Sequence, residues 1–295
     1  MRIRTKGIRA CARELKNYPH CNTEMIPCPE KAKGACMSGN ENNFARKSNF
    51  ARKSDFVRMN YFTGRLTDLI YPRHCPVCDG LIGYSDAFIC ESCRGRIRYI
   101  EGAVCAKCGK PLQEEEAEYC YDCARKRHYY KSGTALFEYK SMAASIYRFK
   151  YKGRQEYADF FGKKLAEHLE DYLRIWKPEA FVPVPIHSSR MRVRGYNQAE
   201  VLAKKLSRET GIPTRADLIK RCKKTVPQKN LSDGERQNNL KKAFKICRND
   251  VKLDTIVIID DIYTTGSTID AVAYELLKKG VVNIYYASLS IGKGL

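Results

Sequence analysis

Residues 257–268 read Val-Ile-Ile-Asp-Asp-Ile-Tyr-Thr-Thr-Gly-Ser-Thr, and this stretch decides the fold. The apolar and β-branched residues 256–259 are typical of a strand that is buried on both faces. Two adjacent carboxylates, Asp260 and Asp261, come next, and a loop rich in hydroxyl groups then opens a helical pattern. A buried strand followed by a short loop and a helix is typical of the parallel sheet of an α/β protein.

The loop after this strand is suited to bind a phosphate group. The helix that follows presents free backbone N–H groups and the positive end of its dipole, and Gly266 lets the backbone approach a ligand closely. We expect phosphate contacts from Thr264, Thr265, Gly266, Ser267 and Thr268. The alternative is an ordinary turn between strand and helix, in which Asp, Ser and Thr only cap the helix.

The two carboxylates add a second half to this site. Asp260 and Asp261 can accept hydrogen bonds from neighbouring hydroxyl groups, as on a ribose, while the loop holds a 5′-phosphate one sugar-length away. A sugar phosphate therefore fits the whole stretch.

The rest of the second half alternates between strand and helix patterns. Strands are predicted at 134–139, 180–184, 218–219, 255–259 and 283–290, and helices at 141–150, 155–175, 196–210 and 268–279. Such alternation predicts an α/β domain with a mostly parallel sheet and flanking helices.

A second stretch combines a strand end with positive charge. Residues 182–187 read Val-Pro-Val-Pro-Ile-His. The charged and polar side chains that follow are Arg190, Arg192, Arg194, Asn197 and Gln198. Guanidinium groups at a strand end suit a strongly anionic diphosphate, but residues 194–198 also fit the start of a helix with structural contacts only. His187 is a candidate for acid–base chemistry, and the alternative is a hydrogen-bonded structural role.

Eight of the 14 cysteines form four Cys-x-x-Cys pairs that recur every 15 residues. The pairs are Cys75 and Cys78, Cys90 and Cys93, Cys105 and Cys108, and Cys120 and Cys123. This spacing predicts a duplicated zinc ribbon with two closed, structural sites of four thiolates each, and iron–sulfur ligation is the competing interpretation. Joining first with second and third with fourth gives two closed sites, and so does joining first with third and second with fourth. His74 and His128 flank the pairs as substitute ligands or as bystanders.

Two motifs resemble those of known families. Residues 257–268 resemble the phosphoribosyl-diphosphate motif of type I phosphoribosyltransferases, and residues 182–198 resemble the signature of ComF proteins. Together with the cysteine pairs, the resemblance covers roughly residues 60–295. It implies a type I phosphoribosyltransferase-like sheet preceded by a small double zinc ribbon.

The resemblance also implies a function. It implies that the chain binds phosphoribosyl diphosphate with Mg²⁺ and transfers the phosphoribosyl group to an acceptor that the sequence does not identify. In this interpretation Arg190, Arg194, Asn197 and Gln198 join the phosphate loop and the two aspartates in binding the ligand. Catalytic roles fall to Asp260, Asp261, Arg236 and His187, with Arg236 in a loop that could close over the substrate. ComF proteins are associated with DNA uptake in genetic competence.

The charge supports a rival interpretation. The chain has 54 basic and 33 acidic residues, a formal net charge of +21, which favours polyanionic partners. A non-catalytic module could bind phosphoribosyl diphosphate as a regulatory ligand and engage single-stranded DNA or uptake proteins. Tyr147, Tyr151 and Tyr157 lie among basic residues and could stack on bases, or could simply pack a helix. A purely structural adaptor is disfavoured by the intact aspartates and loop.

Three domains are expected. Residues 1–58 form a basic, disordered tail that includes a tandem hexapeptide at 43–48 and 49–54. Residues 59–130 form the double zinc ribbon, and residues 131–295 form the phosphoribosyltransferase-like domain. A run of 18 apolar residues and a secretory signal pattern are both lacking, so a cytoplasmic protein without membrane insertion is expected.

Overall fold

A computed structural model describes residues 72–82, 88–222, 243–248 and 252–292. Residues from Pro72 onward belong to one compact unit. The predicted tail and the first residues of the predicted ribbon domain lie outside the described residues, so the domain bounds at 58 and 130 stay predictions. Among the described helices, none combines the length and apolar character needed to span a bilayer.

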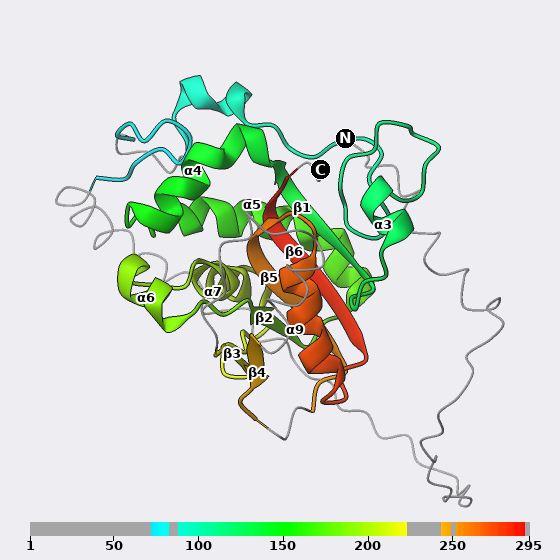
Figure 1. Ribbon diagram of the computed structural model, residues 1–295. Helices are drawn as coiled ribbons and strands as arrows, with labels where there is room; N and C mark the ends of the chain where they lie inside the picture. Colours follow the sequence, from blue (N-terminus) through cyan, green and yellow to red (C-terminus); the bar gives the residue numbers. More distant parts are fainter. Residues whose placement is uncertain (1–71, 83–87, 223–242, 249–251, 293–295) are drawn as a thin grey trace, which may run out of the picture. The chain divides into compact units, whose positions relative to one another are not determined.

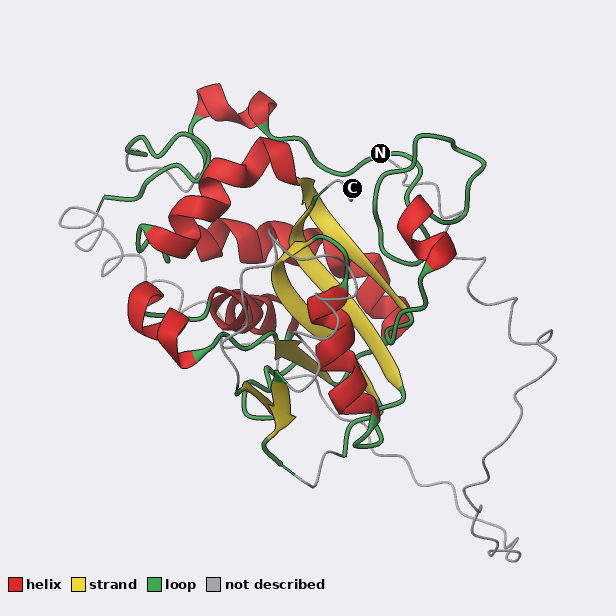
Figure 2. Ribbon diagram, in the orientation of Figure 1, coloured by secondary structure: helices red, strands yellow, loops and turns green. Residues whose placement is uncertain are grey.

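Four strands form the main sheet, and every neighbouring pair is parallel (Figure 2). Their spatial order is β1 (Ser132–Glu138), β6 (Asn283–Ile291), β5 (Thr255–Tyr263) and β2 (Ala180–Pro183). This arrangement confirms the expected parallel sheet. A separate antiparallel pair joins β3 (Ile219–Arg221) to β4 (Phe244–Ile246). The sequence pattern predicted the first of these short strands and missed the second.

Alternation along β5 divides the core into two layers. Ile256 and Ile258 belong to one buried cluster, and Val257 and Ile259 belong to the other. Because successive side chains of a strand point to opposite faces, both faces of the sheet are covered. The described helices that follow β1 are α4 (Tyr139–Tyr151), α5 (Tyr157–Trp176), α6 (Ser188–Arg194), α7 (Gln198–Thr210) and α9 (Ser267–Leu277).

Figure 1 shows α9 in front of the sheet and α4, α5 and α7 behind it. The buried clusters agree, since Val272 of α9 belongs to the same cluster as Ile256, whereas Phe161 of α5 and Leu202 of α7 belong to the same cluster as Val257. The expected flanking helices are therefore confirmed. The short helix α6 was not predicted, and it contains Arg190, Arg192 and Arg194 of the arginine-rich stretch.

The cysteine-rich segment contains two copies of one turn. In the first copy the N–H of Cys75 donates to the Gly80 carbonyl and the N–H of Asp79 donates to the Cys75 carbonyl. In the second copy the N–H of Cys105 donates to Lys110 and the N–H of Gly109 donates back to Cys105. A short helix follows each turn, η2 (Glu91–Arg96) in the first copy and α3 (Tyr121–Arg125) in the second. The repeated hydrogen bonds confirm that the segment is a duplicated unit.

Each copy is attached to a different part of the α/β domain. Arg148 of α4 donates to the Val77 carbonyl at 2.7 Å, which fixes the first copy against α4. The second copy is held by β6, because the hydroxyl of Tyr286 donates to the Cys108 carbonyl at 2.6 Å. Tyr286 is fully buried and lies directly over Gly133 of β1.

We predict that Gly133→Ala destabilises the protein by about 1–3 kcal/mol, the usual cost of overpacking a core. A Cβ atom at residue 133 would collide with the ring of Tyr286, so the ring must move and weaken its hydrogen bond to Cys108. Chemical denaturation measures the effect. Gly95→Ala is the matched control, since a Cβ atom there meets nothing within 4 Å. Equal stability of the two variants would contradict the packing described here.

Candidate functional site

The unequal lengths of two neighbouring strands position the two aspartates. Strand β2 pairs with β5 up to Pro183 opposite Ile259, whereas β5 and β6 remain paired as far as Tyr263 opposite Ile291. The prediction that the strand ends at residue 259 was wrong. Asp260 and Asp261 lie within β5 because its pairing with β6 continues, but they lie beyond the end of β2.

The two carboxylates are partly buried among basic side chains. Lys150 of α4 places its Nζ atom 2.8 Å from Oδ1 of Asp261. Burial raises the pKa of Asp260 to about 7, and the neighbouring charge of Asp261 contributes to the rise, while Lys150 and Arg221 oppose the shift. The site therefore holds one carboxyl group that changes charge near neutral pH.

Arg221 of β3 lies close enough to Asp260 for their charges to interact. Burial lowers the pKa of Arg221 to about 10, the charge of Arg190 contributes to the lowering, and Asp260 opposes the shift. This places positive charge from β3 and α6 beside the end of β5. Sequence reasoning missed Arg221, which lies outside every motif. It also missed Lys150 as a site residue, although Lys150 lies in the basic and aromatic stretch that was noted.

The loop that the sequence predicts to bind phosphate, residues 264–268, has a left-handed turn at its glycine and is named the phosphate loop. Gly266 has a φ angle of 75°, in the left-handed region, and forms the N-cap of α9. The first helical hydrogen bond runs from the N–H of Asp270 to the Gly266 carbonyl, so the N–H groups of the preceding turn point out of the helix end. The hydroxyls of Thr265 and Ser267 lie 3.0 Å apart. Thr264 is exposed, whereas Ser267 is buried.

The residues of the arginine stretch make structural contacts. His187 caps α6, because its Nδ1 atom accepts from the Ser189 N–H at 3.2 Å. Asn197 caps α7 and donates to the Val184 carbonyl at 3.1 Å. Arg194 donates to the side-chain oxygen of Gln198 at 2.9 Å. The ligand-binding and catalytic roles of these residues stay predictions.

Arg236, the remaining predicted catalytic residue, lies outside the described residues. It belongs to residues 223–242, between β3 and β4. Its role also stays a prediction. On either side of this segment, Arg221 of β3 and Phe244 of β4 pair with each other.

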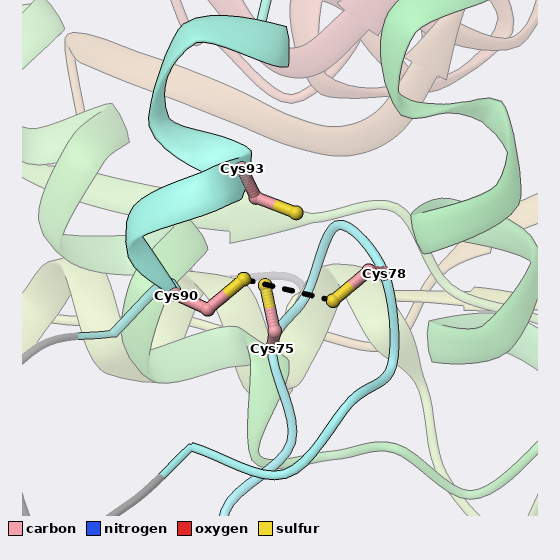
Figure 3. A group of neighbouring side chains, drawn as sticks. All are labelled: Cys75, Cys78, Cys90 and Cys93. Atoms are coloured by element: carbon pink, nitrogen blue, oxygen red, sulfur yellow. Dashed lines mark hydrogen bonds between the residues drawn. The ribbon is translucent and has the colours of Figure 1, made fainter.

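The eight paired cysteines form two separate groups. One group contains Cys75, Cys78, Cys90 and Cys93, as Figure 3 shows, and the other contains Cys105, Cys108, Cys120 and Cys123. The first pair therefore joins the second, and the third joins the fourth. This result resolves the two schemes that the sequence left open.

The sulfur positions fit zinc. Within each group the sulfur atoms all lie within 4.8 Å of one another. The Sγ atoms of Cys78 and Cys90 are 3.7 Å apart, and those of Cys108 and Cys120 are 3.6 Å apart. A tetrahedron with Zn–S bonds of about 2.3 Å has edges of about 3.8 Å, which matches these distances. Four protein ligands close each site, so zinc here would stabilise the ribbon and leave no position for a reacting water.

We predict two zinc ions per chain, one for each group. Replacement of one ligand by Cys123→Ser is expected to reduce the zinc content towards one, because three remaining thiolates hold the ion less tightly. Elemental analysis of purified protein measures this content. Cys247→Ser is the control, since Cys247 is an exposed cysteine outside both groups. A wild-type content below one ion per chain would contradict the assignment.

We also predict that Asp260→Asn raises the melting temperature at about pH 8, with a gain that shrinks towards about pH 5.5. The pKa of Asp260 is about 7 in the folded protein, above the unfolded value of about 3.9. Between these two pKa values the folded chain keeps a proton that the unfolded chain has lost, so the free energy of unfolding of the wild type falls as the pH rises from about 4 to about 7 and stays low above 7. Thermal melts across this range measure the effect. Asp171→Asn, on the exposed face of α5, should show a constant difference, and a constant difference for Asp260→Asn would refute the shift.

Comparisons with known proteins agree with this description. A family model described as "Double zinc ribbon domain" matches residues 66–124. Competence protein F of Haemophilus influenzae is 41% identical over 109 residues, which make up 36% of this chain and 48% of that protein. DNA utilization protein YhgH of Salmonella typhimurium is 32% identical over 142 residues, or 47% of this chain and 62% of that protein. The chain thus spans between about half and under two thirds of the length of these relatives.

A solved structure also aligns with the chain. The purine phosphoribosyltransferase from Pyrococcus horikoshii Ot3 is 21% identical, covers 45% of this chain and 73% of that chain, and has a TM-score of 0.31. That score is too low to support an inference by itself. The similarity to known proteins is carried instead by the sequence matches. The chain is similar to competence protein F over about half of that protein's length, and its match to a double zinc ribbon fits the two four-cysteine groups.

Proposed function

We propose that this chain binds phosphoribosyl diphosphate at the end of β5 and transfers its phosphoribosyl group to an acceptor. The proposal rests mainly on the position of Asp260 and Asp261. Both lie beyond the end of β2 and shortly before the N-terminus of α9, where no side chain caps the helix. Carboxylates suit the ribose hydroxyls, and the N–H groups of the helix end suit the 5′-phosphate.

The basic residues around the aspartates are suited to bind the diphosphate. Lys150 pairs with Asp261, and Arg221 and Arg190 lie close enough to influence each other's charge. If ribose hydroxyls donate to the carboxylate of Asp261, the ammonium of Lys150 would be free to bind the diphosphate. Arginine and lysine on the diphosphate would stabilise the charge that grows as it departs. Bound Mg²⁺ would neutralise part of the same charge.

The transfer itself is a substitution at the anomeric carbon. A nucleophile on the acceptor forms a bond to that carbon, and the bond from the carbon to the diphosphate oxygen breaks with its electron pair. The nucleophile then loses its proton. Asp260 is a candidate to receive it, because its raised pKa lets it exchange a proton near neutral pH. His187 is the alternative that the sequence suggested.

The names of two relatives refer to competence or to DNA. One relative is named a competence protein and another a DNA utilization protein. We therefore propose that the site serves the uptake or use of DNA, in the cytoplasm. A transferase would consume phosphoribosyl diphosphate, whereas the rival, a regulatory module, would bind it without turnover.

The rival function is a phosphoribosyl-diphosphate-responsive module that binds single-stranded DNA. Tyr147 and Tyr151 favour it, because both are exposed and their ring centroids lie 5.2 Å apart on α4. The guanidinium of Arg194 lies 4.7 Å from the ring of Tyr151, next to the proposed ligand site. Tyr157, which the sequence grouped with them, is buried and donates to Asp79, so it is excluded from such a surface.

We predict that the wild-type protein binds phosphoribosyl diphosphate in the presence of Mg²⁺, and that the double variant Asp260→Asn, Asp261→Asn binds at least about tenfold more weakly. The variant loses the charged acceptors for the ribose hydroxyls but keeps the size of both side chains. Isothermal titration calorimetry measures both affinities. Adding candidate acceptors and assaying diphosphate release then separates an enzyme from a sensor.

The matched control is the double variant Glu170→Gln, Asp171→Asn. It also removes two adjacent carboxylates, but these lie on the exposed face of α5 and pair with Arg174. Equal affinity in wild type and in the Asp260, Asp261 variant would refute the site. Binding without diphosphate release, together with ligand-dependent and salt-sensitive binding of single-stranded DNA, would favour the rival.

A further inference from the structure

His128 bridges the second four-cysteine group and the helix of the phosphate loop. Its Nε2 atom lies 3.6 Å from Sγ of Cys123, and its Nδ1 atom lies 2.9 Å from Oδ2 of Asp270 in the first turn of α9. The side chain of His128 is 1% exposed, so these contacts are shielded from water. A sulfur of the zinc site and the phosphate-loop helix are therefore connected through one imidazole ring.

The same ring lies against the phosphate loop. A Cβ atom at Gly266 would come within 3.0 Å of Cε1 of His128 and 2.6 Å of the Tyr263 hydroxyl. Tyr263 in turn shares a hydrogen bond of 2.7 Å with Tyr130, whose ring stacks on His128. The backbone turn that would receive the phosphate thus rests on residues at the C-terminal end of the ribbon segment.

Two further groups from this segment reach the loop. The Nζ atom of Lys126 donates to the Thr265 carbonyl at 3.2 Å and lies 3.3 Å from Oδ2 of Asp270. The N–H of Tyr129 donates to Oδ1 of Asp270 at 3.0 Å. Asp270 is a negative charge in the helix turn that would hold the phosphate, and an uncompensated carboxylate there would repel it. Lys126, His128 and Tyr129 together surround this carboxylate.

We propose that Lys126 and His128 are positioning residues for the phosphate, through which the second zinc ribbon fixes the loop and screens Asp270. This inference rests on the proposed function, since it concerns the same ligand. The ribbon is then part of the binding site for the sugar phosphate, in addition to its structural role. The first ribbon has no equivalent contact among the described residues, because its flanking histidine, His74, faces Arg154 and Glu156.

Zinc at the second four-cysteine group would influence the phosphate loop through α3. Cys120 precedes α3 and Cys123 lies within it, so the second four-cysteine group holds the helix from which Lys126 and His128 follow. Zinc at that group would therefore fix the starting point of the segment that contacts Asp270. Loss of zinc there should loosen the loop, whereas loss at the first group should not act by this route.

The experiment compares two replacements of His128. Asn can place a nitrogen close to the position of Nδ1 and keep the contact with Asp270, whereas Gln places its nitrogen nearer to Nε2 and loses that contact. We expect His128→Gln to weaken binding of phosphoribosyl diphosphate on the order of tenfold and His128→Asn to retain most of the affinity. Both variants should keep the wild-type zinc content. His74→Gln is the matched control and should bind as the wild type does.

Hydrogen exchange of the ligand-free protein provides a second readout. The amides of residues 266–270 should exchange faster in His128→Gln and in Lys126→Ala than in wild type and His74→Gln. Failure of the wild type to bind the ligand would refute the proposed function. The exchange rates would still show whether Lys126 and His128 hold the loop in place. Unchanged exchange and affinity in His128→Gln would overturn the positioning role, as would zinc loss in both His128 variants, which would show that the ring serves the metal alone.

Discussion

The pairing of β5 with β6 beyond the end of β2 is the constraint on which the site depends. If β5 ended with β2 at Ile259, the two aspartates would belong to a loop with its own conformational freedom. The register from Asp260 opposite Ser288 to Tyr263 opposite Ile291 instead fixes their backbone within the sheet. The same extension determines where α9 begins, because only three residues separate Tyr263 from Ser267. The carboxylates and the phosphate loop are thus positioned by one set of backbone hydrogen bonds.

The two zinc ribbons support different halves of this arrangement. The first holds α4 through Arg148, and α4 delivers Lys150 to Asp261. The second contacts β6 through Tyr286 and the phosphate-loop helix through His128. Both ribbons therefore contact elements near the end of β5. The first contacts the helix that carries Lys150, and the second contacts α9, which follows the phosphate loop. Neither contact requires zinc to take part in chemistry.

The sequence was most informative where a short motif imposes its own geometry. The run at 257–268 predicted a buried strand, a loop with Gly266 at the turn and a helix, and the cysteine spacing predicted two groups of four thiolates. It was least informative where a residue acts through tertiary contact. Arg221 lies in a three-residue strand with no motif, and β4 is too short to show a periodicity. The end of β5 was misplaced because two aspartates favour a turn, and strand pairing overrode that local preference.

The duplication of the ribbon has a consequence for how such a chain can change. In each copy the backbone is shaped by four thiolates and by the hydrogen bonds of one turn, so very few positions are needed to keep it folded. The other positions are free to diverge. One copy carries an aspartate that binds Arg154 and Tyr157, and the other is followed by a lysine and a histidine that bind Asp270. Two copies of one backbone framework can thus present different side chains to two different neighbours, and a substitution in one copy leaves the contacts of the other copy in place.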